Sequence, residues 1–380
     1  MTRQFRSDDT SHWNEKFGNS SDGSYAPSTG VDSVIDSACT GTSGTTSLSA
    51  TNAGFAIGQL ILIHQTRGAS AGVYELNKIA NYSAGTITTS YPLCNTYGTG
   101  AQVLVMPQLA SGNIAGGVTI TGKAWNGTVG GIYAKFCNGT FTIAGSLVAS
   151  GVGFRGGAAS SNNALNGNPA GQAGEGNPGL GTNTYATNCY SANGNGGGGG
   201  VNGSGPQAGG TGGGGGNGTT GSGGTSQAGG IAGAGGGAVG NVGLTSMLFG
   251  GGGGGSQGQN NTAAAGGNAG GIILIIAKNI PTITGNIYIN GNAGGNAATS
   301  GAGGGAGGSC LLKFQTGDMG TNKITVAAGS GGTGSYAGGA GSVGRIHADY
   351  SSSITGTTSP ALDSTQDFSL NTGSGMFLIF

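Results

Sequence analysis

A glycine tract at residues 194–271 constrains the fold more than any other part of the sequence. It contains runs such as GNGGGGG and FGGGGGGS, with one main apolar interruption, VGLTSMLF, at residues 242–249. The segment that follows, IILIIA at 272–277, is apolar, largely β-branched and uncharged. Glycine loses more conformational entropy on folding than any other residue, so the tract can become ordered only if its backbone finds hydrogen-bond partners.

The sequence is compatible with two alternative states of this tract. Glycine lets backbones approach closely, and extended segments in a polyproline-II-like geometry can hydrogen-bond laterally without a side-chain core. An ordered bundle of such segments, packed as polyglycine-II helices, is one state, and a flexible brush is the other. A collagen triple helix is excluded because the sequence has no sustained Gly-X-Y period.

The composition excludes several classes of protein. The chain has 92 glycines among 380 residues, 8 prolines, 6% charged residues and a formal net charge of zero. Disordered chains are usually rich in charge and proline, so charge repulsion does not keep this chain open. Neutrality removes the electrostatic argument for a nucleic-acid or anionic-membrane partner. Between residues 156 and 277 the only charged side chain is Glu175.

Residues 1–36 are polar and are predicted to form an N-terminal attachment arm. Trp13 and Phe17 are expected to anchor this arm in an assembly, and the alternative is a frayed tail. The first residues contain no apolar core of a secretory signal. We therefore expect a chain that is assembled inside a cell and released, as virion proteins are, or one whose leader is missing from this sequence.

Residues 37–107 are predicted to form a small β domain. Short alternating or β-branched runs such as FAIGQLILI at 55–63 and QVLVM at 102–106 are separated by turn residues, which is typical of a small sandwich or barrel. His64, Arg67 and Glu75 form the densest polar cluster in the sequence. They could line a binding pocket, but a polar turn with satisfied hydrogen bonds is the favoured interpretation.

A repeat begins near residue 117 and determines the predicted architecture. Residues 130–153 align with 270–295, a third copy spans 307–332, and a partial copy starts at 344. Each unit has a Gly-Gly start, an apolar strand, a turn, an alternating strand and a glycine-rich exit. Units of this size that bury one face by stacking are typical of solenoids. We predict an all-β chain with a β-solenoid at residues 108–350.

The glycine-rich exits are predicted to lie together on one face of that solenoid, because insertions between coils map to one side. The main insertion spans residues 153–270. Residues 351–380 are predicted to be a polar linker that ends in an apolar strand. This strand is expected to cap the solenoid or to pair with a neighbouring subunit, and its residues are Met376, Phe377, Leu378, Ile379 and Phe380.

The sequence offers little catalytic chemistry. GxGxxG matches arise by chance in a chain this rich in glycine, and the three histidines are far apart. The five cysteines include no CxxC pair, so we expect no metal site; a Cys39–Cys94 or Cys94–Cys189 bridge stays open. Acidic pairs of the kind used by glycoside hydrolases are missing. We predict no catalytic residue, no cofactor and no enzyme activity.

The strands GGIILIIAKNI and GNIYINGNAGG, beside the glycine tracts, resemble those of bacteriophage tail-fibre adhesins. Some of these adhesins carry a sandwich of polyglycine-II helices whose loops contact the host receptor. The chain is also similar to glycine-rich β-solenoid surface proteins of environmental bacteria. The resemblance covers roughly residues 55–350 and implies a virion or extracellular role without enzyme activity. It carries over no binding residue, because the loops that bind are the variable part.

The first functional hypothesis is a phage tail-fibre or receptor-binding protein that recognises a cell-surface glycan or protein. Its expected receptor contacts are Tyr185, Tyr190, Leu244 and Phe249. The alternative is a self-assembling subunit of an extracellular filament or sheath. Both hypotheses expect copies of the chain itself as partners and no nucleic acid or membrane. A polysaccharide-cleaving solenoid enzyme is a third, disfavoured class.

Overall fold

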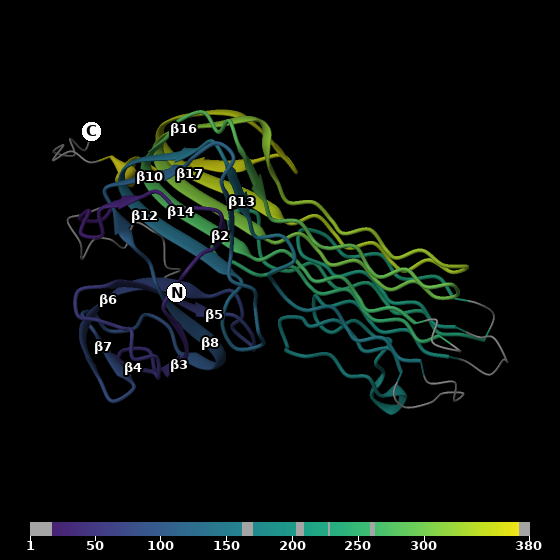
Figure 1. The fold of residues 1–380 in the computed structure, drawn as a ribbon. Helices are drawn as coiled ribbons and strands as arrows, with labels where there is room; N and C mark the ends of the chain where they lie inside the picture. Colours follow the sequence, from purple (N-terminus) through teal and green to yellow (C-terminus); the bar gives the residue numbers. More distant parts are fainter. Residues whose placement is uncertain (1–16, 162–169, 203–208, 227–228, 259–262, 372–380) are drawn as a thin grey trace, which may run out of the picture.

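The computed structural model describes residues 17–161, 170–202, 209–226, 229–258 and 263–371. Within them nearly all regular structure is β-strand, so the chain is all-β as predicted. The helical residues described are two 3₁₀ turns, η2 (Tyr185–Thr187) and η3 (Phe368–Leu370). A barrel and a curled parallel sheet form the base, and glycine-rich segments project from the sheet (Figure 1).

A closed antiparallel barrel of six strands forms one part of the base. Its strands follow the order β3-β4-β7-β6-β5-β8. In chain order they are β3 (Asp36–Gly41), β4 (Ser47–Ala50), β5 (Leu60–Gln65), β6 (Tyr74–Ser83), β7 (Thr86–Thr89) and β8 (Tyr97–Val105). On β5, Ile61 and Ile63 belong to the cluster of apolar residues within the barrel. Leu60 and Leu62 belong to a second cluster outside it, which explains why the strand is apolar on both faces.

The second part of the base is one parallel sheet of twelve strands. Its main path is β1-β10-β12-β14-β16-β15-β13-β11-β2; β17 pairs with β16 and β18, and β9 pairs with β12. The strands are β1 (Ser24–Tyr25), β2 (Gly30–Val31), β9 (Gln108–Leu109), β10 (Ser111–Ile114), β11 (Thr119–Thr121), β12 (Ile132–Ile143), β13 (Ser146–Val148), β14 (Ile272–Ile280), β15 (Asn286–Tyr288), β16 (Ser309–Thr325), β17 (Arg345–Ser359) and β18 (Asp363–Gln366).

The predicted β-solenoid is wrong. The repeated units do stack in register, since Ile132 pairs with Ile272 and Leu147 with Ile287. However, β16 pairs with β14 near its start and with β15 at its end, so both rows of strands belong to one curled sheet. The connections between units are glycine segments that leave the sheet and return (Figure 1). The repeat therefore identified which strands are neighbours but not how the chain returns between them.

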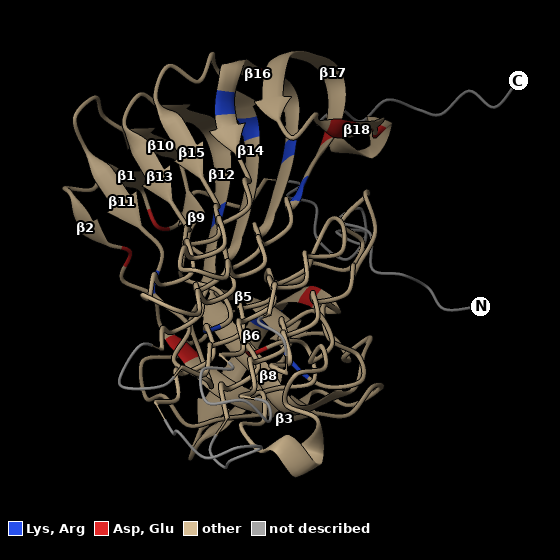
Figure 2. Cartoon of the chain, turned by 90° about the vertical axis from the view of Figure 1, so that its right-hand side faces the viewer, with Lys and Arg blue, Asp and Glu red and all other residues tan. Residues whose placement is uncertain are grey.

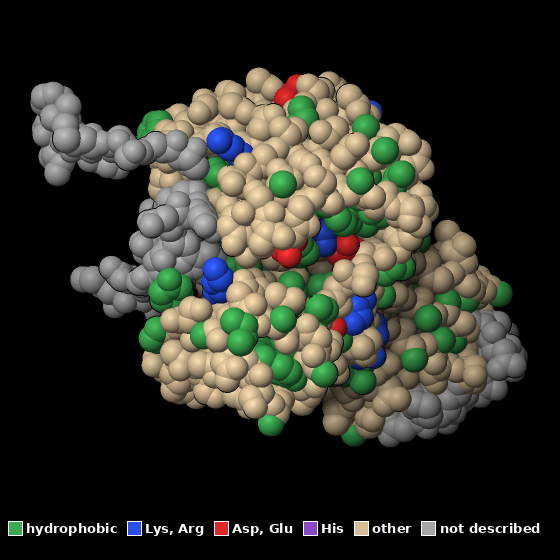
Figure 3. Space-filling model, turned by 60° about the vertical axis from the view of Figure 1, so that its left-hand side comes forward, with side chains coloured by type: hydrophobic (Ala, Val, Ile, Leu, Met, Phe, Trp, Pro, Cys, Tyr) green, Lys and Arg blue, Asp and Glu red, His purple; other side chains and the backbone are tan. Residues whose placement is uncertain are grey.

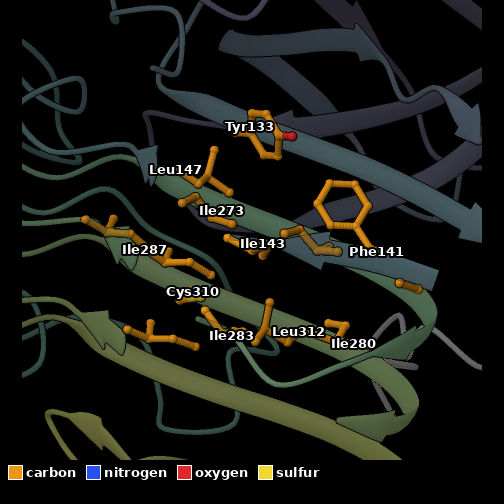
Figure 4. Packing of buried hydrophobic residues seen from close by; sticks show 14 of the residues in the cluster. Tyr133, Phe141, Ile143, Leu147, Ile273, Ile280, Ile283, Ile287, Cys310 and Leu312 are labelled. Atoms are coloured by element: carbon orange, nitrogen blue, oxygen red, sulfur yellow. The ribbon is translucent and has the colours of Figure 1, made fainter. Parts of the chain in front are cut away.

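The core of the sheet lies inside its curl. Ile143, Leu147, Ile273 and Ile287 point toward one another there (Figure 4). Burial of each such side chain contributes about 1.5–3 kcal/mol. On β14, alternate residues face opposite ways: Ile273 lies in this core, and its neighbours lie in the cluster shared with the barrel. Strand β14 is thus covered on both faces, which accounts for the uninterrupted apolar run at 272–277.

Two ion pairs join residues near the barrel to the sheet. Lys123 Nζ donates to the Asp36 carboxylate at 2.7 Å, and Lys135 Nζ donates to Asp32 Oδ2 at 2.7 Å. Lys135 is buried, and its ammonium group lies 5.1 Å from the centre of the Tyr25 ring. Acidic and basic side chains meet in the hollow between the sheet above and the barrel below (Figure 3). The Lys123–Asp36 pair thus links the segment after β11 of the sheet to strand β3 of the barrel.

The third part is the glycine array, defined as the described residues of 149–271, 289–308 and 326–344. Its segments run side by side as extended chains (Figure 1). Along residues 251–256 every third backbone N–H donates to the same neighbouring segment, at 2.8–3.0 Å. The bonds run from Gly251 to Gly216, Gly254 to Gly213, Gly252 to Glu175, Gly255 to Gln172, Gly253 to Gly267 and Ser256 to Ala264. One segment therefore donates to three neighbours, whereas a β-strand bonds to two.

This packing leaves no room for side chains at the centre of the glycine array. A Cβ atom on Gly254 would overlap the carbonyl oxygen of Gly198. The backbones thus lie too close together for even a methyl side chain to fit between them. Glycine is required there because of close approach, as on the axis of collagen, and not because of an unusual backbone conformation.

We predict that Gly254→Ala lowers the free energy of unfolding by at least about 1–3 kcal/mol, because the added methyl group forces bonded backbones apart. Gly223→Ala is the matched control: the nearest atom to its new Cβ is Gly233 O, at 3.6 Å. The control should change stability by less than about 1 kcal/mol. Denaturant unfolding of both variants measures the difference, and equal stabilities would contradict the close packing.

Candidate functional site

Glu175 anchors the glycine array to the base. Its side chain is fully buried, and Oε2 accepts hydrogen bonds from Arg155 Nε at 2.8 Å and Trp125 Nε1 at 3.1 Å. Oε1 lies 3.3 Å from Arg67 Nη1, and the Arg67 guanidinium stands over the Trp125 ring at 5.4 Å. Arg67 follows barrel strand β5, Trp125 precedes sheet strand β12, and Arg155 begins an array segment. One carboxylate thus joins all three parts of the molecule.

The apolar interruption at 242–249 docks the array on the barrel. His64 Nε2 donates to the carbonyl oxygen of Met247 at 2.9 Å, and His64 Nδ1 lies 2.9 Å from the Thr66 hydroxyl. Burial lowers the pKa of His64 to about 4, although the bond to Met247 opposes this shift. The neutral ring satisfies both contacts, with Nε2 protonated and Nδ1 accepting from Thr66. His64 therefore holds the interruption in place.

The predicted receptor contacts fall into two groups. Leu244 and Phe249 are each 1% exposed and belong to the apolar cluster between the array, the barrel and the sheet. They offer no surface to a receptor, so we do not retain them as receptor contacts. Tyr185 and Tyr190 are half-buried at the edge of the array, with ring centres 6.1 Å apart. Both keep accessible surface, Tyr185 as the first residue of η2 and Tyr190 shortly after it.

The predicted assembly contacts lie mostly outside the described residues. Phe17 is 1% exposed and packs in the cluster between barrel and sheet of its own chain. This burial accounts for its apolar character without a partner. The other predicted assembly residues all lie outside the part of the chain that the structure describes, and they are Trp13, Met376, Phe377, Leu378, Ile379 and Phe380.

The cluster of His64, Arg67 and Glu75 does not form a pocket. Arg67 turns to Glu175, and His64 faces the array. The Glu75 carboxylate accepts from the backbone N–H groups of Cys94 and Asn95, both within 3.1 Å. Burial raises the pKa of Glu75, and the bonds from Asn95 oppose that rise. All five cysteines are free thiols, so neither considered disulfide is formed.

A cavity of about 240 Å³ lies where the barrel, the array and the last sheet strands meet. We call it the junction pocket. Residues from several separate parts of the sequence line it, among them Tyr74, Thr245, Lys313, Asp349, Asp367 and Phe368. Sequence reasoning missed this site because the residues come together only in the fold. One signal was present: the aligned repeats place Lys313 opposite Asp349, and these residues pair in the sheet.

A chain of charges forms one wall of the junction pocket. Lys313 Nζ donates to Asp349 Oδ2, and His347 Nε2 lies 3.1 Å from Asp349 Oδ1. His347 Nδ1 lies 2.7 Å from Asp363 Oδ2 on β18. Both ring nitrogens of His347 thus face carboxylate oxygens. His347 has no ring nitrogen left to act as a base toward a ligand.

The described residues provide no group of three or more His, Cys, Asp or Glu side chains arranged to hold a metal ion. Nor does this part of the chain contain a helix of the length and apolarity needed to cross a membrane. Comparison with protein-family models, with curated proteins and with solved structures gives no match. The function is therefore argued from the geometry of the chain itself.

The contacts of Asp349 predict an acid-sensitive contribution to the stability of the fold. Burial opposes ionisation of Asp349, but the bond from His347 and the charge of Lys313 prevail and lower its pKa below the ordinary 3.8. A lowered carboxyl pKa contributes stability above the unfolded value, and this contribution is lost as the pH falls through the folded value. Wild type should be more stable than Asp349→Asn at pH 7, and the difference should shrink below about pH 4.

Unfolding of wild type and Asp349→Asn, measured from pH 7 to pH 2.5, tests this expectation. Lys278→Gln is the control, because Lys278 is exposed and lies outside the junction pocket. A difference between wild type and Asp349→Asn that stays constant over the whole range would contradict the assignment.

Proposed function

We propose that this chain is a non-enzymatic structural and adhesive protein of a virion or an extracellular assembly, with a phage tail-fibre or receptor-binding role as the first candidate. The barrel and sheet act as a base, and the glycine array presents its outer edge and far turns to a cell surface. The observation that carries the proposal is the three-residue period of backbone bonds along the array. It supports a polyglycine-II geometry, because that type of helix has three residues per turn.

The array is suited to display rather than to catalysis. Among the residues between 156 and 277, Glu175 alone is charged, and its carboxylate is already engaged by two arginines. The array presents an almost uncharged end (Figure 2). Because the scaffold is held by backbone bonds, residues in its connecting turns can change without loss of a side-chain core. A cell-surface glycan or protein is the proposed partner.

The bonding of the buried ionisable side chains also supports a non-enzymatic role. The Glu75 carboxylate accepts hydrogen bonds from backbone N–H groups, and the Glu175 carboxylate forms ion pairs with Arg67 and Arg155. Both ring nitrogens of His347 face carboxylates. A general base needs a free site within hydrogen-bond reach of the proton that it removes. These groups are instead used to hold segments together.

A filament or sheath subunit is the second candidate, and an open sheet edge favours it. Strand β18 pairs with β17 only at residues 347–350. Within the described residues no strand covers the outer edge of β17 from 351 to 359, and its sequence there, SSSITGTTS, has no charge. Proteins usually protect exposed edges with charges or proline. An uncharged edge of this length can accept a strand from a second copy.

We predict that the full chain binds whole bacterial cells of a susceptible host and that Tyr185→Ala combined with Tyr190→Ala weakens this binding by about tenfold or more. Tyr185 begins η2 and Tyr190 follows it in the sequence, and both side chains are partly exposed. Tyr288→Ala, in strand β15 of the base, is the matched control. Fluorescence of labelled protein on a panel of cells measures the binding.

Electron microscopy of the same samples separates the two candidates. Discrete particles that bind cells support the adhesive role. Long uniform fibres without cell binding would contradict it and favour the filament, in which case Thr357→Lys, placed on the open edge of β17, should abolish the fibres. Equal cell binding by wild type and the double tyrosine variant would show that η2 is not part of the surface that binds the receptor.

A further inference from the structure

We propose that the junction pocket binds one uncharged pyranose sugar unit, stacked on the ring of Phe368. The pocket lies where β6, β16, β17 and residues 365–368 of the base meet Gly243 and Thr245 of the array. It shares no residue with η2 or with the far turns of the array. The proposal therefore goes beyond the receptor recognition assigned to the array and does not depend on it.

The size of the cavity favours a single ring. Pockets for drug-sized ligands usually enclose about 300–1,000 Å³, whereas this cavity measures about 240 Å³. The pocket is open to solvent, since Phe368 at its rim is 62% exposed. One ring of a longer glycan can enter while its neighbours stay outside. A polymer chain lying in a groove would need a longer depression.

Most of the charged groups around the pocket already bond one another, which leaves the Asp367 carboxylate as the main charged acceptor and favours an uncharged ligand rich in hydroxyl donors. Lys313 is paired with Asp349, and His347 lies between Asp349 and Asp363. The groups that can still bond a ligand are mostly neutral. The Thr245 hydroxyl accepts from Asn241 and keeps its own hydrogen to donate. Thr365 contributes a further hydroxyl to the lining.

One carboxylate oxygen remains for a ligand hydroxyl. Asp367 uses Oδ1 to accept from the backbone N–H of Ser369, which leaves Oδ2 as an acceptor. A carboxylate beside hydroxyl groups offers both acceptors and donors. Sugar hydroxyls are donors and acceptors at once, so they match this mixture better than an ion does. The polar groups would orient the ring, and the aromatic side chain would supply apolar contact.

Phe368 is held on a rigid support. It lies in η3, which is capped by the Asp367 side chain. Two residues later, Leu370 is buried in the cluster between barrel and sheet, and its carbonyl oxygen accepts from Gln315 Nε2 at 3.0 Å. The backbone that carries the exposed ring is therefore held in place before a ligand arrives. A preorganised aromatic surface loses little entropy when the apolar face of a sugar stacks on it.

The test uses the full chain and methyl glycosides of glucose, galactose, mannose and N-acetylglucosamine, titrated by ligand-observed NMR. We expect saturable binding of at least one glycoside in the millimolar range and a loss of affinity of about tenfold in Phe368→Ala. Asp367→Asn should also weaken binding, while asparagine preserves the cap of η3. Leu180→Ala is the matched control, because Leu180 is 59% exposed and lies outside the pocket.

Melting temperatures of the variants establish that they are folded. Binding that is lost in Phe368→Ala and kept in Leu180→Ala, with equal melting temperatures, supports the proposal. Failure of all four glycosides to bind in the millimolar range would overturn it. So would binding that Phe368→Ala leaves unchanged, or stronger binding of a small charged probe, choline or acetate, than of any glycoside.

Discussion

The backbone hydrogen bond between glycine segments is the interaction on which the rest of the structure depends. In the array one segment donates in turn to three neighbours, and the segments approach so closely that a Cβ atom at Gly254 would overlap another backbone. A typical hydrogen bond contributes only about 0.5–1.5 kcal/mol net. Many such bonds must therefore form together to offset the entropy of ordering glycine. The array behaves as a core made of main chain.

Such a core needs a base that does contain side chains. Strand β14 is buried on both faces, and β14, β16 and β17 each start at the point where an array segment enters the sheet. The register of the sheet sets the spacing of the segments that leave it. Glu175 then fixes the array against the barrel through Arg67 and Arg155. The fully buried Glu175 carboxylate thus acts at a junction between parts.

The sequence predicted the strands well and their closure poorly. The repeat placed Ile132 beside Ile272 and Leu147 beside Ile287, which is the register of the sheet. It could not reveal that the chain returns through glycine segments, because a repeat reports which units are alike and not how they connect. The β-solenoid prediction assumed a way of connecting the units that the repeat does not report. Side-chain patterns cannot predict bonds between segments that have almost no side chains.

The functional sites, too, could be predicted from the sequence only in part. Leu244 and Phe249 were predicted to meet a receptor because apolar residues in a glycine tract suggest exposed turns, yet they fill the interface with the barrel. The junction pocket joins residues as distant as Tyr74 and Phe368. Only the Lys313–Asp349 pair could be read from the aligned repeats. The importance of Glu175 was visible as a lone charge, but its arginine partners were not.

Amide hydrogen exchange of the full chain, followed by mass spectrometry, tests the central claim most directly. Peptides from residues 209–216 and 250–256 should exchange slowly, at rates near those of β14, since their N–H groups are bonded within the array. Exchange of these glycine amides at the rate of an unstructured peptide, while β14 stays protected, would contradict an array held by backbone hydrogen bonds.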